Sequence, residues 1–186
     1  MSNEQRVPLL IARHSLLFER REVKKMLEMK VDGLTLDPLT NMPIITLKDV
    51  SGKRVLPIWV GIFEANAIAL QMEKVATPRP MTHDLIKNII DGMAAKVNHI
   101  VINDLRDNTF YATISLSINN HVVNIDSRPS DAIAVALRAE APIYVAEKVI
   151  DMAKGIEISN REDINDSEKW KNWLENLKPE DFGREV

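Results

Sequence analysis

The sequence contains no cysteine, which excludes disulfides, thiolate zinc sites, iron–sulfur clusters and a cysteine nucleophile. Glycine is also scarce: the chain has six, and they do not cluster into a phosphate-binding loop. No pair of histidines has the spacing of a zinc site, and a serine elbow of the G-x-S-x-G type is absent. The chemistry that remains rests on carboxylates, histidine, hydroxyls and arginine.

The chain has no excess of positive charge, since 24 Lys and Arg face 27 Asp and Glu. A protein that binds nucleic acid mainly by neutralising phosphates is normally basic, so any action on nucleic acid must come from a local site. An apolar run of the roughly 20 residues that a membrane helix needs is missing, and we expect neither a secretory signal nor a membrane partner. We predict a cytoplasmic protein, with which the lack of cysteine is compatible.

The chain does contain enough apolar residues for one domain, since 45% of its 186 residues are hydrophobic. Only 5% are aromatic, so the core must consist mainly of Ile, Val, Leu, Ala and Met. We predict a helical extension over residues 1–28, a compact domain over 29–154, and an acidic linker with a helix over 155–186. The first segment is basic and helix-prone as far as Met29, which fits either a docking arm or a solvated helical face.

From Lys30 onwards the apolar period changes to two, which indicates strands. We predict strands over 29–36, 43–50, 54–60, 97–104, 109–118, 121–125 and 142–145, and helices over 62–72, 82–93, 131–139, 146–154 and 167–177. Pro57 favours an edge position or a bulge, because proline cannot donate to the ladder. Asn119 and Asn120 suit a tight hairpin turn, because asparagine tolerates positive φ.

Two junctions that lead into helices share the order Arg, Pro, hydroxyl, Asp. They are Arg79-Pro80-Met81-Thr82-His83-Asp84 and Asp126-Ser127-Arg128-Pro129-Ser130-Asp131. Loops in such places often carry chemistry because a rigid frame holds them. In the second junction, Asp126 and Asp131 can serve as oxygen ligands for Mg²⁺ or Mn²⁺, and Arg128 can hold a phosphate.

The same residues also fit ordinary helix starts. Thr82 and Ser130 can cap their helices, and Asp84 and Asp131 lie in first turns, where the helix dipole favours a carboxylate. Capping of this kind contributes about 1 kcal/mol and needs no ligand. His83, which we expect near the surface, can act as a base or acid near neutral pH. The residues alone therefore leave both interpretations open.

Five ordered blocks resemble a known family. They are Leu56-Pro57-Ile58-Trp59-Val60-Gly61 with Glu64-Ala65, then Arg79-Pro80-Met81-Thr82-His83-Asp84-Leu85, Thr109-Phe110-Tyr111-Ala112, Asp126-Ser127-Arg128-Pro129-Ser130-Asp131-Ala132-Ile133-Ala134, and Pro142-Ile143-Tyr144-Val145. Through these blocks the chain, from about Met29 to Met152, resembles the bifunctional nuclease domain family. The resemblance implies a single compact α+β domain whose mixed, largely antiparallel sheet is packed by helices. It also implies nuclease activity on DNA and RNA and a homodimer or higher homo-oligomer.

On this resemblance we predict a metal-assisted nuclease, whose site residues are inferred from the matched positions. The predicted catalytic residues are His83, Asp84, Asp126 and Asp131, the predicted substrate-binding residues are Arg79, Arg128 and Ser130, and the predicted ligands of Mg²⁺ or Mn²⁺ are Asp126, Asp131 and Glu64. The metal would polarise the phosphate and lower the pKa of an attacking water. A non-catalytic oligomeric binding or regulatory module and a small-molecule phosphoesterase are the alternatives. A shared site requires the two junctions to meet in the fold.

Overall fold

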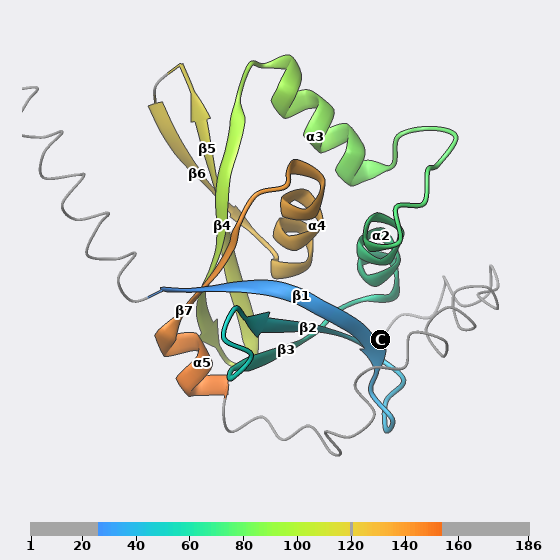
Figure 1. The fold of residues 1–186 in the computed structure, drawn as a ribbon, viewed down its shortest axis with the longest axis vertical. Helices are drawn as coiled ribbons and strands as arrows, with labels where there is room; N and C mark the ends of the chain where they lie inside the picture. Colours follow the sequence, from blue (N-terminus) through green and yellow to red (C-terminus); the bar gives the residue numbers. More distant parts are fainter. Residues whose placement is uncertain (1–25, 120, 154–186) are drawn as a thin grey trace, which may run out of the picture.

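A seven-stranded mixed sheet is the frame of the part of the chain that the structure describes (Figure 1). The structure is a computed structural model, which describes residues 26–119 and 121–153. The strand order is β3-β2-β1-β7-β4-β5-β6, and neighbouring strands are antiparallel except for the parallel pair β4 and β7. The predicted α+β class, with a mixed and largely antiparallel sheet, is confirmed.

The order along the chain explains where the helices come. The strands are β1 (Met26–Leu36), β2 (Pro43–Asp49), β3 (Val55–Trp59), β4 (Lys96–Arg106), β5 (Thr109–Ile118), β6 (His121–Ser127) and β7 (Ile143–Ala146). The helices of the described residues are α2 (Ile62–Met72), α3 (Thr82–Gly92), α4 (Pro129–Ala139) and α5 (Glu147–Ala153). In chain order, helices α2 and α3 therefore come between β3 and β4, and α4 connects the edge strand β6 to β7.

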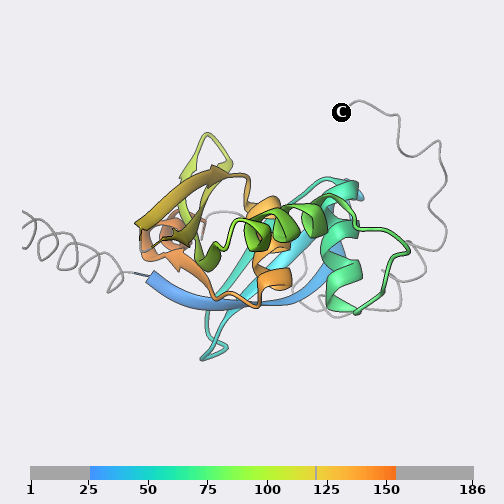
Figure 2. The same ribbon diagram turned by 90° about the horizontal axis from the view of Figure 1, so that it is seen from above.

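Helix α4 is the central helix of the domain. It packs against α2, α3, β4 and β5, and the three helices gather on the same side of β4 (Figures 1 and 2). Its residues 132–136 are all buried, as expected of a helix with so little polar surface. The start of α4 is thereby held close to α2 and α3.

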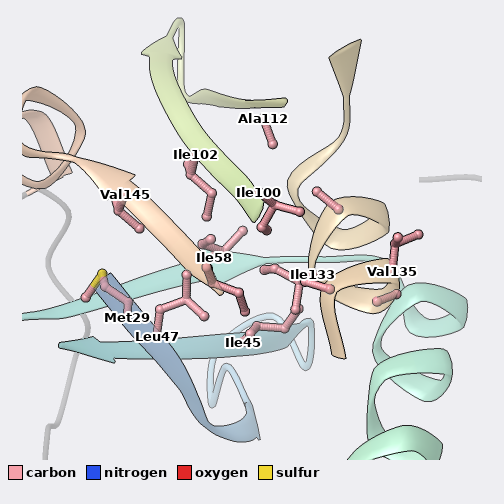
Figure 3. Close-up of a cluster of buried hydrophobic side chains, with 14 of the residues drawn as sticks. Met29, Ile45, Leu47, Ile58, Ile100, Ile102, Ala112, Ile133, Val135 and Val145 are labelled. Carbon is pink, nitrogen blue, oxygen red and sulfur yellow. The ribbon is translucent and has the colours of Figure 1, made fainter. Parts of the chain in front are cut away.

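The core between the sheet and the helices is aliphatic, as the low aromatic content predicts. Ile100 and Ile102 of β4 point to one face, because alternate side chains of a strand share a face, and both are fully buried. They lie in one cluster with Ile133 of α4 and with Ile45 and Leu47 of β2 (Figure 3). Burying an aliphatic side chain of this size contributes about 1.5–3 kcal/mol.

Strand β4 extends beyond the predicted 97–104, because Lys96 and residues 105–106 also pair with β5, and it contains two bulges. Its register against β5 shifts at Asn98 and again at Asn103. The Asn98 Oδ1 atom accepts a hydrogen bond from the Ser117 hydroxyl at 3.1 Å, and the Asn103 amide donates to the Thr113 hydroxyl at 2.8 Å. A bulge inserts one unpaired residue and bends its strand, so these amides anchor both irregularities to β5.

The tight turns and the edge strand agree with the sequence. Asn119 has a φ of 49°, and Asp107 and Asn108, between β4 and β5, have φ of 47° and 58°. Asn and Asp are the residues other than glycine that adopt this left-handed conformation most readily. Pro57 lies in β3, which is an edge strand as predicted.

The predicted helical character up to Met29 is wrong for residues 26–29, which form the start of β1. There Met26 pairs with Ala146 and Met29 pairs with Ile143 of β7. The apolar side chains suit either a helix or a strand, and the distant partner strand decides between them. Residues 1–25 and the predicted helix over 167–177 lie outside the described residues. Of the helices that the structure describes, none is long and apolar enough to cross a membrane.

Candidate functional site

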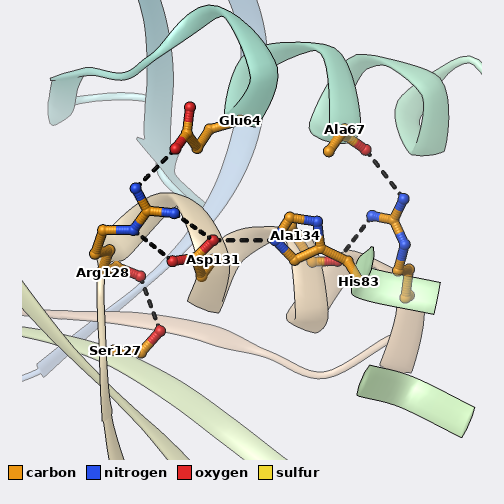
Figure 4. A network of polar contacts seen from close by, with 8 residues as sticks. Glu64, Ala67, His83, Ser127, Arg128, Asp131 and Ala134 are labelled. Atoms are coloured by element: carbon orange, nitrogen blue, oxygen red, sulfur yellow. Dashed lines mark hydrogen bonds and ion pairs between the residues drawn. The ribbon is translucent and has the colours of Figure 1, made fainter. Parts of the chain in front are cut away.

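The two Arg-Pro junctions meet, because α3 and α4 begin beside each other (Figure 4). The His83 Nε2 atom lies 3.1 Å from the Asp131 Oδ1 atom. His83 is the second residue of α3 and Asp131 the third residue of α4. The geometric condition for a shared site is therefore met by these two residues.

Arg128 connects this pair to a third helix. Its guanidinium donates from Nε and Nη2 to the two carboxylate oxygens of Asp131, at 2.6 and 3.1 Å, and from Nη1 to Glu64 Oε1 at 2.7 Å (Figure 4). Glu64 lies in the first turn of α2. We call Glu64, Arg128, Asp131 and His83 the Arg128 network. It links the starts of α2, α3 and α4.

The side chains of the Arg128 network differ in how exposed they are. The Arg128 side chain is 65% exposed, while that of Glu64 is 19% and that of Asp131 is 27% exposed. A guanidinium carries five N–H donors, and the contacts with Asp131 and Glu64 use three of them. The two acids therefore hold an accessible cation in a fixed orientation, with donors left for an anion.

Hydrogen bonds decide the charge of Asp131. Its partial burial acts to raise the pKa of the carboxyl group, but the hydrogen bonds from Arg128 and His83 outweigh burial, so the pKa lies below its usual value. Asp131 is then a carboxylate, which only accepts hydrogen bonds, so His83 must donate from Nε2. In the neutral ring the Nδ1 atom is consequently the proton acceptor. His83 is only 8% exposed, contrary to its expected position near the surface.

A second charged contact, which sequence reasoning missed, lies next to the first. The Arg138 side chain is 6% exposed and donates to Asp84 Oδ1 at 2.6 Å, and to the carbonyls of Ala134 and Ala67 at 3.1 Å each. A signal was present: Asp131 and Arg138 are the charged residues of α4 and lie seven apart, which places them on one helix face. Charged residues in such an apolar helix are rarely buried unless they are paired.

Both carboxylate oxygens of Asp84 accept hydrogen bonds within the protein. Its Oδ1 atom accepts from Arg138 and its Oδ2 atom accepts from the backbone N–H of Met81 at 2.8 Å. These hydrogen bonds, with that from Arg138 the larger influence, lower the pKa of Asp84. Both of its oxygens are thus used to hold the start of α3 against α4, directly beside His83.

The predicted helix caps are wrong at both junctions. Helix α3 begins at Thr82 with Met81 at the N-cap, and α4 begins at Pro129 with Arg128 at the N-cap. Thr82 and Ser130 thus lie inside the first turn. Proline at the first helical position is favourable because its φ is already helical. Ser130 is only 7% exposed, so this predicted substrate-binding residue lies below the surface.

Arg79 and Asp126, the other predicted residues, form no hydrogen bond or ion pair with the Arg128 network. Arg79 is exposed in the connector before α3, and Asp126 is exposed on β6 with its backbone opposite Thr113. The predicted metal ligands are not gathered, since the guanidinium of Arg128 lies between Glu64 and Asp131. Within residues 26–119 and 121–153, no group of three or more His, Asp or Glu side chains is arranged to hold a metal ion.

Comparison with known proteins agrees with the resemblance. A family model described as the bifunctional nuclease domain matches residues 45–158. An uncharacterised protein of Mycobacterium tuberculosis (strain H37Rv) is 38% identical over 163 residues, which are 83% of this chain and 97% of that protein. Bifunctional nuclease 1 of Arabidopsis thaliana and bifunctional nuclease 2 of Oryza sativa subsp. japonica are each 32% identical over 107 residues, which are 55% of this chain and 33% of the plant protein. The chain thus spans about a third of these plant proteins. The match to the family model and these relatives together show that the chain belongs to the bifunctional nuclease domain family.

Proposed function

We propose that this chain is a nuclease that hydrolyses phosphodiester bonds of DNA and RNA. Membership of the family and the names of the plant relatives, which are bifunctional nucleases, support the proposal. The observation that carries it is the Arg128 network, in which an acid–base group and an exposed cation share one carboxylate. Phosphodiester hydrolysis needs both: a group that moves a proton and a group that stabilises charge on the phosphate.

Arg128 is the proposed phosphate-binding residue. Its two unused N–H donors can contact phosphate oxygens, and a planar guanidinium suits two oxygens of one phosphate. Because Asp131 and Glu64 fix the orientation of the guanidinium, little side-chain freedom is lost when the substrate binds. Arg79, exposed before α3, is the proposed second contact to the nucleic-acid backbone, where such contacts position the strand.

His83 is the proposed general base. Its Nδ1 atom accepts the proton of a water that attacks the phosphorus, while Asp131 holds the ring at Nε2 and stabilises the imidazolium that forms. The P–O bond to the leaving sugar oxygen breaks, and this oxygen takes its proton from solvent. The near burial of His83 favours a nucleophile as small as water. In this assignment Asp84 and Arg138 act indirectly, by holding the start of α3 in place.

The dependence on Mg²⁺ or Mn²⁺ stays a prediction. A cation between Glu64 and Asp131 would have to replace the guanidinium of Arg128, and Asp126 is not part of that arrangement. The proposed roles of His83, Asp131 and Arg128 therefore involve only groups of the chain itself. Hydrolysis measured in EDTA and then with added Mn²⁺ or Mg²⁺ tests the metal separately.

The test of the function uses labelled single- and double-stranded DNA and RNA with the full chain. We expect the wild type to cleave, His83→Gln to lose about 100-fold or more of the rate, and Arg128→Lys to lose binding of the substrate. His99→Gln is the matched control, since His99 lies on β4 beside Tyr144. A wild-type chain that cleaves none of the substrates, or a folded His83→Gln variant that cleaves at the normal rate, would refute the proposal.

A second candidate is a non-catalytic binding or regulatory module. The observation that favours it is that both carboxylates of the Arg128 network are already paired and that His83 is nearly buried. In this function the network only joins three helices. His83→Gln would then lower the thermal unfolding midpoint and leave nucleic-acid binding, measured by fluorescence anisotropy, unchanged.

A further inference from the structure

Strand β6 is an edge strand that is almost entirely exposed. Its first six residues are exposed, and they include the apolar Val122, Val123 and Ile125, whose exposed fractions are 55%, 41% and 44%. One side of the strand pairs with β5 over seven residues without a register shift. Among the strands that the structure describes, β6 has no neighbour on its other side, so a straight row of backbone N–H and C=O groups faces outwards.

The opposite edge strand, β3, is protected against pairing with another strand, whereas β6 is not. Strand β3 has five residues, contains Pro57, follows Lys53 and Arg54, and buries its three central side chains. Proteins protect exposed edges with proline, lysine, bulges or short strands, because an open edge pairs with other strands. β6 has none of these, and Asp126 is its one Asp, Glu, Lys or Arg residue.

We propose that β6 is the surface through which two copies of this chain associate, with the two strands antiparallel about a two-fold axis at Asn124. This register overlaps all seven residues of the strand. It places Val123 of each copy opposite Ile125 of the other, and Asn124 opposite Asn124. Cross-strand apolar pairs of this kind stabilise a sheet, whereas like charges opposite each other destabilise it. Asp126 comes opposite Val122, so the two acids do not meet.

This pairing would bring apolar side chains together on the face of the sheet that the helices cover. Val123 pairs with Leu116 and Ile125 pairs with Ile114 within one chain, and both partners on β5 are buried in the core. The four apolar side chains of the two copies would therefore extend the existing core across the axis. Leu85 and Ile89 of helix α3 and Met93 directly after it are also exposed, but a helix surface offers no open backbone groups for pairing. This association does not depend on the proposed activity, and it gives the predicted homodimer a definite surface.

The absence of cysteine from the wild type allows a direct test of the register. In Asn124→Cys the two introduced side chains lie opposite each other, with Cβ atoms about 4.5–5.5 Å apart, so mild oxidation should give a disulfide-linked dimer. The matched control is Asp126→Cys. In the proposed register the two residues at position 126 lie four residues apart, about 14 Å along the strands, so they should not cross-link.

Sedimentation velocity over a concentration series tests the surface itself. We expect the wild type to dimerise and Ile125→Lys to weaken the dimer at least about tenfold. Val75→Lys and Ile89→Lys, which change apolar residues elsewhere that are at least as exposed as Ile125, should leave it intact. If Ile125→Lys fails to fold, cross-linking of Asn124→Cys decides. A monomeric wild type, equal cross-linking at residues 124 and 126, or dissociation by Ile89→Lys alone would overturn the proposal.

Discussion

Glu64 depends on a glycine three residues before it. The Glu64 carboxylate lies against the Cα atom of Gly61, in the space that any Cβ at this position would occupy. Gly61 has a φ of −69°, which every residue can adopt, so the backbone conformation does not require glycine here. What glycine provides is room for the carboxylate that holds Arg128.

Gly61→Ala should therefore disturb the Arg128 network without changing a charge. The new methyl group displaces the Glu64 carboxylate and breaks its 2.7 Å hydrogen bond with Arg128. We expect nuclease activity to fall about tenfold, as for the loss of one interaction of about 1.4 kcal/mol. Urea denaturation should show no loss of stability, because Gly→Ala at a compatible φ is neutral or stabilising. Gly33→Ala, where a Cβ meets nothing within 4 Å, is the control. Normal activity of Gly61→Ala would show that the Glu64 contact is dispensable.

A different cluster, around Asp104, should make stability depend on acid pH. Hydrogen bonds from Lys148 and then Arg106 lower the pKa of Asp104 to about 2. A carboxyl group with a lowered pKa stabilises the fold above its unfolded pKa, and this contribution disappears as the pH falls from about 4 towards 2. Asp104→Asn should therefore lower the urea midpoint at neutral pH and have little effect near pH 2. A difference between wild type and variant that stays constant with pH would contradict this assignment.

At the scale of helices, Arg138 holds three elements at one point. It contacts α3 through Asp84, α2 through the Ala67 carbonyl, and its own helix α4 through the Ala134 carbonyl. Its side chain is nearly buried, so water does not replace these contacts when the side chain is removed. Asp84 and the Ala67 carbonyl would then lose their charged donor.

Arg138→Met should lower the free energy of unfolding by about 2–4 kcal/mol, because hydrogen bonds to a buried charge are lost while the acceptors remain. Lys87→Met is the control: its ion pair with Asp91 is a surface i,i+4 contact, worth about 0.3–0.5 kcal/mol. Urea unfolding of both variants measures the difference. If the two losses were equal, Arg138 would not be the connection that the geometry indicates.

The sequence predicted the elements better than their ends. Period-two and period-3.6 patterns located the described strands and helices, because these patterns follow from which face is buried. The caps at Thr82 and Ser130 were wrong, since a hydroxyl near a helix start suggests a cap even where Pro129 already occupies the first helical position. The start of β1 at Met26 depends on β7, which a local pattern does not contain.

The sequence drew attention to residues of the Arg128 network but did not show how they are connected, and their roles stay a prediction. His83, Arg128 and Asp131 stand out in the two junctions, but they meet only because α3 and α4 pack together. The choice of Glu64 and Asp131 as metal ligands followed from their chemical type. Sequence reasoning did not show that Arg128 lies between them, because this depends on where α2 begins relative to α4.

At the scale of the whole molecule, β7 joins two halves of the sheet. It pairs antiparallel with β1, which continues to β2 and β3, and parallel with β4, which continues to β5 and β6. β7 has only four residues, yet Val145 within it is fully buried and belongs to the main core cluster. Both halves therefore depend on the same short strand.

Val145→Ala should destabilise both halves together, by about 2 kcal/mol, from the lost methyl groups and the cavity that they leave. We expect hydrogen exchange of β2 and β5 amides, followed by mass spectrometry, to accelerate by the same factor, because one cooperative unit opens as a whole. Val55→Ala on the exposed end of β3 is the control. Acceleration in β5 alone would show that the halves unfold separately.

The late position of β7 also has a consequence for synthesis. β1 ends at residue 36 and β7 at residue 146, a difference of 110 residues. At roughly 5–20 residues per second, about 5–22 s pass on the ribosome before the inner edge of β1 can receive its partner. During this interval the nascent chain carries an unpaired strand edge, a feature that makes incompletely folded chains prone to aggregate.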